Sequence, residues 1–242
     1  MIEAKALEVS YGPVTAVRGI DLTVGDGEVV AVLGRNGAGK TTTLKAFAGL
    51  LPASDGTISL DGEDVTRLPA DERVRRGLVL VPEGRGMFAE LSVRENLVMG
   101  AFHRRLSRSR LGDDIDRATE RFPRLLERLD QPAGSLSGGE QQMLAIARGL
   151  MSEPRVLMVD EPSLGLAPIV IELLYGLLAD LAKRGLTLVI VEQYVQVALG
   201  IADRAYVLDK GLVALSGPAA DLAASPELID AYLSAAPEET PA

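Results

Sequence analysis

The segment Gly34-Arg35-Asn36-Gly37-Ala38-Gly39-Lys40-Thr41 decides the fold of this 242-residue chain. It matches the pattern G-x-x-x-x-G-K-[ST] and stands between an apolar stretch at residues 28–33 and a helical stretch at residues 40–50. Glycines let the backbone curl so that several N–H groups point at one phosphate, and the following helix adds the positive end of its dipole. The segment therefore predicts a phosphate-binding loop (P-loop) between a buried strand and a helix.

The P-loop also supplies two side chains with distinct roles. We expect Lys40 to reach the β- and γ-phosphates of a nucleotide and the Thr41 hydroxyl to ligate Mg²⁺. The alternative is an ordinary glycine-rich turn with an exposed lysine, and the complete pattern in its strand-to-helix context argues against it. The residues expected to hold the nucleotide phosphates are Gly34, Asn36, Gly37, Ala38, Gly39, Lys40, Thr41 and Thr42.

Two carboxylates follow a second apolar stretch at residues 156–159. Asp160 would orient the Mg²⁺ shell, since P-loop sites take an acidic partner from the end of a neighbouring strand. Glu161, one residue further, would act as general base on the attacking water, a role typically worth about 10²–10⁴-fold in rate. An acidic pair after a strand is otherwise a solvated turn, and the nearby P-loop makes that interpretation weaker.

A third segment, Leu136-Ser137-Gly138-Gly139-Glu140-Gln141, begins a helix with the capping box Ser137-x-x-Glu140. Two glycines in the first turn cost helix stability, roughly 1 kcal/mol each relative to alanine. They are understandable if a phosphate must approach this helix closely. The P-loop already provides one phosphate site in each chain. A second one therefore suggests that two chains complete each other's sites, although an ordinary helix start remains the alternative.

Composition excludes several other chemistries. The chain has no cysteine, no tryptophan and one histidine, His103, which excludes disulfides, cysteine nucleophiles and histidine metal clusters. A net charge of −9 argues against a protein that grips nucleic acid. The apolar runs are far shorter than the ~18–20 residues of a membrane span, and residues 1–6 lack a signal-peptide core. We expect a soluble intracellular chain and an exposed His103.

Short apolar stretches alternate with amphipathic ones, which favours an α/β protein with a largely parallel sheet. Strands are expected at residues 3–9, 20–24 (its antiparallel neighbour), 28–33, 78–81, 156–159 and 186–191, and helices at residues 40–50, 138–151 and 168–183.

Residues 92–131 differ from the rest, because they start with the capping box Ser92-x-x-Glu95 and contain no β-rich stretch. We interpret them as a helical subdomain inserted into the core. A solvated helix surface is the preferred explanation of the charge runs there, over a specific anionic site. The runs are basic (Arg104, Arg105, Arg108, Arg110) and then acidic (Asp113, Asp114, Asp116). A frayed tail is expected at residues 237–242.

Taken together, the three motifs resemble those of the ATP-binding cassette (ABC) ATPases, over essentially the whole chain. The resemblance implies one ABC ATPase domain over residues 1–242, with a mainly parallel P-loop NTPase core and N-terminal antiparallel strands at about 1–91 and 132–236. It also implies a head-to-tail dimer around two ATP molecules, with Mg²⁺. Ser137, Gly138, Gly139 and Glu140 of one chain would complete the ATP site of the other. Tyr11 would stack on adenine, and Ser163-Leu164-Gly165-Leu166 would form the D-loop across the dimer interface.

Two positions depart from the general family pattern. Glu83 replaces a glutamine after the stretch at residues 78–81, and Gln193 replaces a switch histidine. Gln193 can donate a hydrogen bond to a γ-phosphate but cannot carry a proton. Glu83 would add negative charge near Mg²⁺ unless Arg85 compensates it. Both departures put the efficiency of hydrolysis at this chain's own site in question, while Glu161 is retained.

The same departures narrow the resemblance to one ATPase subunit of branched-chain amino-acid importers, with urea and amide importers still open. The resemblance implies a second ATPase subunit, identical or different, two membrane permeases and a solute-binding protein, without nucleic acid. The chain would lie at the cytoplasmic face of the membrane, and the permeases would contact residues 83–94 and the helical subdomain.

Other functions remain as weaker alternatives. A chromosome or repair protein would need a long coiled-coil insertion, a ribosome-acting relative would carry two cassettes, and exporters often fuse membrane spans to the cassette. From a different class, the chain would be a nucleotide-binding regulatory half with weak hydrolysis. Gln193 favours that view and Glu161 opposes it.

Overall fold

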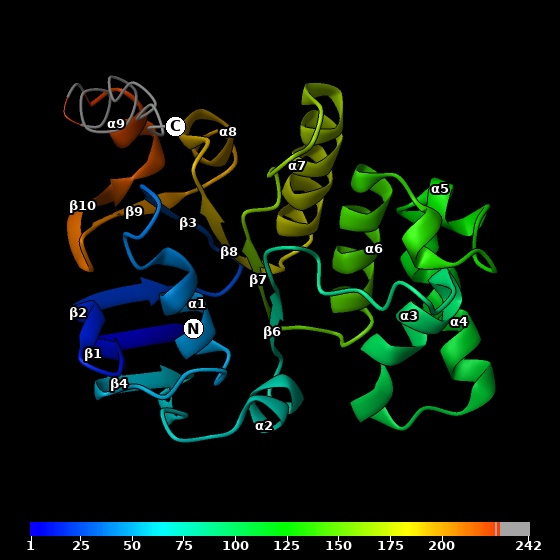
Figure 1. Ribbon diagram of the computed structural model, residues 1–242, viewed down its shortest axis with the longest axis horizontal. Coiled ribbons are helices and arrows are strands. Elements are labelled where there is room, and N and C mark those ends of the chain that lie inside the picture. Colours follow the sequence, from blue (N-terminus) through cyan, green and yellow to red (C-terminus); the bar gives the residue numbers. More distant parts are fainter. Residues whose placement is uncertain (226, 228–242) are drawn as a thin grey trace, which may run out of the picture.

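The computed structural model describes residues 1–225 and 227, and its strands form two sheets (Figure 1). The first sheet is antiparallel, with the order β2-β1-β4-β5. The second has the order β10-β9-β3-β8-β7-β6 and is parallel except for its edge pair β9–β10. The sheets confirm the mixed α/β class and the antiparallel N-terminal strands.

Strand composition explains this division. All six residues of β3 (Val29–Gly34) are buried, as a central parallel strand covered on both faces requires. By contrast, β1 (Ile2–Tyr11) alternates between buried and more exposed positions and pairs with β2 (Val14–Val24), so that Leu7 faces Ile20. The remaining strands of the large sheet that were expected are β6 (Leu78–Val81), β7 (Val156–Asp160) and β8 (Thr187–Glu192).

The structure adds elements that the sequence patterns did not identify. In the first sheet they are β4 (Asp55–Leu60) and β5 (Glu63–Asp64), followed by the short helix α2 (Ala70–Arg75). Near the C-terminal end of the described chain they are α8 (Val195–Leu199), β9 (Arg204–Asp209), β10 (Leu212–Pro218) and α9 (Ala219–Ala223). These strands complete the edges of both sheets.

Helix α1 (Lys40–Phe47) lies in the core between the two sheets, where Leu44 and Phe47 are fully buried. It ends three residues earlier than expected, because the chain turns at Gly49 with a positive φ of 72°. The opposite face of the large sheet packs on α6 (Gly138–Leu150) and α7 (Pro168–Lys183). The P-loop is thus fixed from both sides by packed elements.

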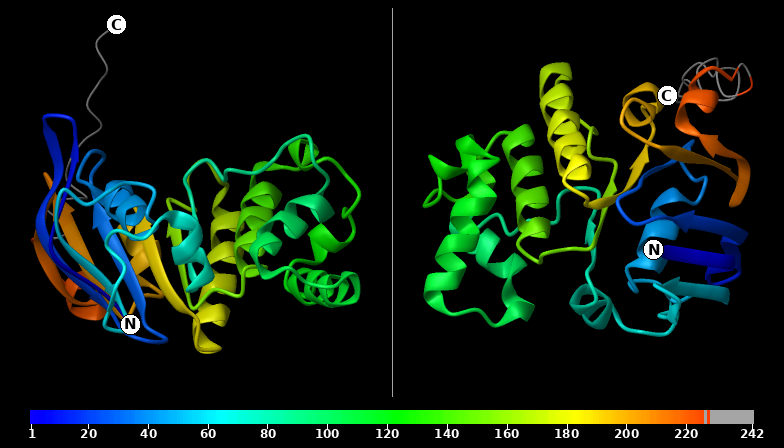
Figure 2. Two further views of the ribbon diagram at one scale, coloured as in Figure 1. Left: turned by 90° about the horizontal axis from the view of Figure 1, so that it is seen from below. Right: turned by 180° about the vertical axis from the view of Figure 1, so that it is seen from behind.

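Residues 92–131 contain α3 (Val93–Gly100), α4 (Arg108–Glu120) and α5 (Pro123–Leu126), at the opposite end of the molecule from the N-terminal sheet (Figures 1 and 2). The charge runs there are mostly exposed, with one correction. Arg104 donates to Asp114 at 2.6 Å and pairs with Glu153 at 2.7 Å, and both Arg104 and Asp114 are largely buried. These two residues belong to an internal ion network because α4 packs against the end of α6.

Within the described residues, no helix combines the length and the apolarity needed to cross a membrane. The tail at residues 237–242 and the end of the expected core, up to residue 236, lie outside the described residues.

Candidate functional site

The P-loop connects β3 to α1 as expected, and its glycines are needed for its shape. Gly37 and Gly39 have positive φ values of 81° and 104°. A Cβ at Gly39 would lie 2.8 Å from the carbonyl oxygen of Ala16, so a larger residue would collide with backbone. Gly39 is also the N-cap of α1, and no side chain caps this helix. The first N–H groups of α1 are therefore left for a ligand.

Lys40 is buried, and its ammonium group lies against the loop that precedes it. The Nζ atom donates to the carbonyl oxygens of Gly34, at 2.8 Å, and Arg35, at 3.2 Å, and lies 3.5 Å from Oε1 of Glu161. A buried cation requires such partners. The structure thus brings the predicted phosphate ligand and the predicted general base together.

Thr41 and Asp160 form a second pair on the same side of the loop. The Thr41 hydroxyl donates to Oδ1 of Asp160 at 3.1 Å. Burial, together with the charges of Glu161 and Glu83, raises the pKa of Asp160 to about 6, although the Thr41 hydrogen bond and Lys45 oppose the shift. A divalent cation would relieve this excess of negative charge, and oxygen atoms of hydroxyl and carboxylate groups are the ligands that Mg²⁺ prefers. The donor set fits Mg²⁺.

Glu161 follows β7 in a strained conformation, with a φ of 46° that is unusual for a residue with a side chain. Its Oε2 atom accepts a hydrogen bond from Nε2 of Gln193 at 2.7 Å. The predicted base and the predicted switch residue therefore touch, although they are 32 residues apart in sequence. Such strain persists where the surrounding structure fixes it, often at functional sites.

These groups line one open cavity of about 500 Å³. It contains most of the predicted P-loop residues together with the carboxylates of Glu83 and Glu161, the amide of Gln193 and Leu164 of the D-loop. The lining residues are Ala16, Asn36, Gly37, Ala38, Gly39, Lys40, Thr41, Thr42, Glu83, Glu161, Leu164 and Gln193. The P-loop, Glu161 and Gln193, which are far apart in sequence, thus line one hollow.

The position of Arg85 shows that it does not neutralise Glu83, as the sequence had left open. Its guanidinium does not compensate Glu83 within the chain, because Nη1 donates to Oε1 of Gln141 on α6 at 2.5 Å. Residues 84–86 all have positive φ, which turns Arg85 away from the cavity that Glu83 lines. Glu83 therefore lies near Asp160 without an arginine partner from this loop.

Tyr11 lies beside the P-loop without lining the cavity. Its ring is 47% exposed, and its hydroxyl oxygen is 3.5 Å from Oγ1 of Thr42. An exposed aromatic ring next to the phosphate loop leaves a face on which a base can stack. Its role in adenine binding stays a prediction.

The signature segment, residues 136–141, lies apart from this cavity: none of the lining residues comes from it in the part of the chain that the structure describes. Ser137 caps α6, its backbone N–H donates to Oε2 of Glu140 at 2.9 Å, and its hydroxyl donates to the same oxygen at 2.8 Å. Glu140 also pairs with Arg128 at 3.5 Å. The Glu140 carboxylate therefore orients Ser137 rather than facing outward.

The glycines of this segment have a packing role that the sequence did not indicate. A Cβ at Gly139 would lie 2.5 Å from Cγ1 of Val170 on α7, whereas at Gly138 it would lie 3.1 Å from the flexible end of Arg85. Gly139 is thus required for the close approach of α6 and α7, whether or not a phosphate also approaches. Phosphate binding is therefore not the only reason for a glycine at position 139.

His103 is not an exposed surface residue as expected. It is half-buried and lines a groove of about 310 Å³ with the exposed side chains of Phe88 and Met99. Burial and the neighbouring charges of Arg104 and Arg75 lower the pKa of His103. The groove also contacts Arg148, whose guanidinium lies 5.7 Å from the ring centroid of Phe88.

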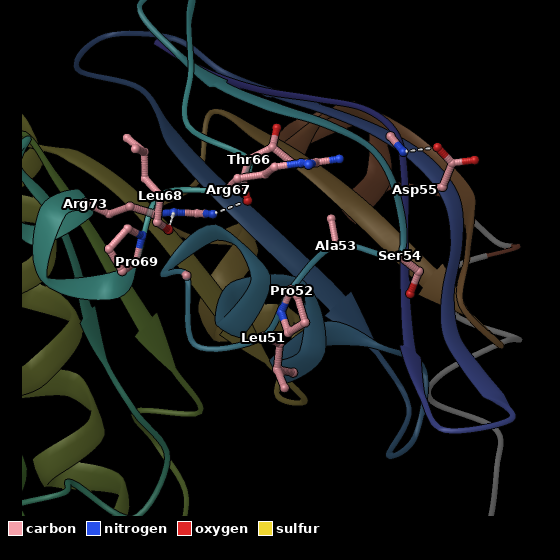
Figure 3. Close-up of a pocket in the computed structure, with 12 residues that line it drawn as sticks. Leu51, Pro52, Ala53, Ser54, Asp55, Thr66, Arg67, Leu68, Pro69 and Arg73 are labelled. Carbon is pink, nitrogen blue, oxygen red and sulfur yellow. Dashed lines mark hydrogen bonds between the residues drawn. The ribbon is translucent and has the colours of Figure 1, made fainter.

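Another hollow, of about 490 Å³, lies at the far end of α1 (Figure 3). Its wall includes Arg73 of α2, which is fully buried and donates to four backbone carbonyls. The acceptors are the oxygens of Ala46, Phe47, Thr66 and Leu68. Because the last carbonyls of a helix carry the negative end of its dipole, Arg73 stabilises the end of α1. Its donors thus serve the fold.

Two supporting residues, Glu192 and Tyr175, were missed at the sequence level. Glu192 is buried at the end of β8 and accepts hydrogen bonds from the Tyr175 hydroxyl and the Ser163 backbone. A charged residue that directly follows the apolar run of β8 was the available signal. Tyr175 offered none, because it lies within the apolar pattern of α7.

The family model described as ABC transporter matches residues 17–164 of this chain. The match contains the P-loop, the signature segment and both carboxylates after β7, and it accords with the two-sheet fold. The chain belongs to the ABC transporter family and is an ATP-binding, ATP-hydrolysing cassette.

Similar proteins include subunits of transporters that move different solutes. The chain is 43% identical to the high-affinity branched-chain amino acid transport ATP-binding protein BraG of Pseudomonas aeruginosa, covering 96% of this chain and 99% of that protein. It is 36% identical to the lipopolysaccharide export system ATP-binding protein LptB of Acidithiobacillus ferridurans, covering 96% of each chain. An export ATPase thus aligns along nearly all of its length with this chain, so the argument against exporters from a missing membrane span is weakened.

Among solved structures, a dimeric bacterial ABC transporter cassette superimposes with a TM-score of 0.82 at 25% sequence identity. The match covers 90% of this chain and 99% of that chain. Cassettes of this family work as dimers with membrane permease subunits, as the sequence resemblance implied.

Proposed function

We propose that this chain powers an importer of branched-chain or other hydrophobic amino acids by binding and hydrolysing ATP at the cavity around Lys40. The observation that carries the proposal is the contact between Glu161 and Gln193 beside the P-loop. A carboxylate and an amide donor beside the P-loop support the hydrolysis of an ATP whose γ-phosphate is held by Lys40. The identity to BraG supports the solute class.

Mg²⁺ fits the oxygen donors Thr41 and Asp160, with Glu83 as a further carboxylate at the same cavity. The ion would neutralise phosphate charge when bound. The chain's own residues then divide the work. Lys40 holds the phosphates, Glu161 accepts a proton from the attacking water, and Gln193 orients that carboxylate through its hydrogen bond.

The signature segment completes the site of a second ATPase subunit. Because Ser137 and its capping box lie away from the P-loop cavity of their own chain, they are free to face a nucleotide on a partner. The chain that pairs with this one is either a second copy or a related subunit. Gly139 lets α6 approach α7 closely, which fixes the start of α6 and with it Ser137.

The groove around His103 is the docking site for a permease segment. The exposed apolar side chains of Phe88 and Met99 line it, and Phe102, next to His103 in sequence, is 78% exposed. Arg148 donates to the carbonyl oxygen of Gly86 at 2.8 Å, so the loop from Glu83 is fixed on α6. A permease seated here would sense that loop, and the chain would lie beside it at the cytoplasmic face of the membrane. A solute-binding protein would act through the permeases.

The first experiment measures ATP turnover by the purified chain and by Glu161→Gln. We expect Glu161→Gln to keep ATP binding and to lose turnover by about 10²–10⁴-fold. If both were equally inactive and a partner ATPase restored turnover to both, the chain would instead be the regulatory half that Gln193 suggested.

The second experiment identifies the transport system. The chain is purified with its membrane partners and reconstituted in vesicles, and ATP-dependent uptake of labelled leucine is compared with uptake of urea. Leucine uptake is expected. Uptake of urea alone would favour the related urea importers, and association with a lipopolysaccharide export complex would favour the function of LptB instead.

A further inference from the structure

Glu192 is a buried carboxylate that connects three parts of the molecule. It ends β8 and is 1% exposed. Its Oε1 accepts from the backbone N–H of Ser163 at 3.0 Å and from the hydroxyl of Tyr175 at 2.8 Å. Its Oε2 accepts from the backbone N–H groups of Gln193, at 3.0 Å, and Tyr194, at 3.4 Å. One side chain thus holds the D-loop, α7 and the segment that carries Gln193.

Tyr175 is the only side-chain donor among these contacts, because the others come from the backbone. It is 4% exposed and lies in the interior of α7. A buried carboxylate needs hydrogen-bond donors, and hydrogen bonds to charged groups are stronger than neutral ones. The Tyr175 hydroxyl therefore determines where the carboxylate sits.

The D-loop depends on this contact for its position. The hydroxyl of Ser163 is buried and has no hydrogen-bond partner in the described part of the chain. A buried hydroxyl without a hydrogen-bond partner costs free energy. A D-loop conformation in which the Ser163 hydroxyl finds a partner would avoid that cost. The hydrogen bond from the Ser163 backbone N–H to Glu192 stabilises the observed D-loop conformation against such a change.

We propose that Glu192 and Tyr175 are positioning residues that make the D-loop and Gln193 move as one unit. Gln193 contacts Glu161 in its own nucleotide site. In the dimer that the resemblance implies, the D-loop would cross the interface to the second subunit. A change at the γ-phosphate would then displace Gln193, Glu192 and Ser163 together and reach the second site. This inference rests on the proposed ATPase function of the cavity.

The central test compares Tyr175→Phe with the matched control Tyr206→Phe. Tyr206 is equally buried, at 5% exposure, and its hydroxyl also accepts and donates hydrogen bonds, but it lies on β9 and contacts Thr23 and Arg204. Each variant loses one buried hydroxyl. We expect Tyr175→Phe to lower kcat about tenfold with an unchanged dissociation constant for ATP, since a bond to a charged group is lost. Tyr206→Phe should retain the wild-type kcat.

A fluorescent reporter reads the movement itself. The chain contains no tryptophan, so Leu166→Trp places a single fluorophore in the D-loop, outside the residues that line the nucleotide cavity. In this background, Mg-ATP should shift the emission when Tyr175 is present and leave it nearly unchanged in Tyr175→Phe. Equal shifts in both, or an equal loss of kcat in Tyr175→Phe and Tyr206→Phe, would overturn the proposal.

The wild-type chain offers an independent test if Tyr175→Phe does not fold. Amide hydrogen exchange of Ser163 and Gln193, which share the Glu192 carboxylate, is measured with and without Mg-ATP. We expect the protection of both amides to change by the same factor, and independent changes would overturn the coupling. Failure of the ATPase proposal is distinguishable, because the wild-type chain would then show neither ATP binding nor turnover.

Discussion

The two helices that we propose to face phosphate begin in opposite ways. Helix α1 starts at Gly39, in a left-handed conformation and without a side-chain cap. Helix α6 starts at Ser137, with a complete capping box closed by Glu140. An uncapped start leaves backbone N–H groups for a ligand, whereas a capped start satisfies some of them internally. In the proposed site, α1 would bind phosphate by its backbone, whereas α6 would offer the Ser137 hydroxyl instead.

A third helix shows what the capping box does without a nucleotide. Helix α3 starts at Ser92, and Ser92 and Glu95 form the same reciprocal hydrogen bonds as Ser137 and Glu140. Local structure therefore does not distinguish a functional helix start from a structural one. The distinction lies in the neighbourhood, because Ser137 is flanked by Gly138 and by the Arg85 guanidinium.

The largest effect, on ATP affinity, is expected from a substitution of Lys40, the first residue of the uncapped helix α1. Lys40→Ala removes the buried cation from the P-loop, and ATP affinity should fall by roughly 30- to 4,000-fold, as for the loss of one partner of a buried charge pair. Isothermal titration with ATP measures the change. Lys183→Ala, which removes an exposed lysine paired with Asp180, serves as the control and should bind ATP normally. Unaltered binding in Lys40→Ala would exclude the P-loop assignment.

The next effect separates the two capping boxes. Ser92→Ala and Ser137→Ala each lose one N-cap, so both should lower the free energy of unfolding by about 1 kcal/mol in urea titrations. Only Ser137→Ala should also lower turnover, by about 100-fold, because a donor to the transferring phosphate is lost. Equal turnover in the two variants would show that Ser137 is merely a cap.

Mixing variants sharpens the same comparison. Lys40→Ala damages the P-loop half of a site, and Ser137→Ala damages the signature half. In a head-to-tail dimer of one chain of each kind, both defects fall in one site and the other site is intact. The mixture should therefore recover turnover that neither variant has alone, and no recovery would exclude sites shared between two copies of this chain.

The sequence predicted the site better than the edges of the fold. Strong local patterns marked β3, the P-loop and the signature helix, because central parallel strands are continuously apolar and glycines are costly elsewhere. The strand β10 gave a weak signal, since its residues alternate only between half-exposed and exposed positions. The contacts of Arg85 and Glu192 depend on tertiary packing between distant segments, and no local pattern contains that information.

A smaller effect on turnover is expected from a substitution of Gln193, which lines the P-loop cavity and donates a hydrogen bond to Glu161. Gln193→His replaces the amide with a ring that can also donate, and in addition can carry a proton. Turnover should equal or exceed that of the wild-type chain in steady-state assays. A large loss would show that Glu83 and Glu161 are arranged around an amide at this position.

The smallest effect is expected on the pH dependence of the free energy of unfolding, to which both capping boxes contribute. Hydrogen bonds from the Ser92 backbone lower the pKa of Glu95, and those from the Ser137 backbone lower the pKa of Glu140, from an ordinary value of 4.5. Because the folded pKa is the lower one, each cap contributes fully above about pH 5, and the contribution is lost as the pH falls through the folded pKa. Glu95→Gln and Glu140→Gln remove this titration, so each should flatten the decline of unfolding free energy between about pH 5 and pH 3.

Urea unfolding at a series of pH values measures both slopes, and a variant with the wild-type slope would show that its carboxylate does not respond to the cap. The two variants should differ in one respect only. Glu140→Gln also loosens the orientation of the Ser137 hydroxyl, which donates to the Glu140 carboxylate at 2.8 Å. Its turnover at neutral pH should therefore decrease, whereas Glu95→Gln should keep normal turnover because Ser92 faces no nucleotide.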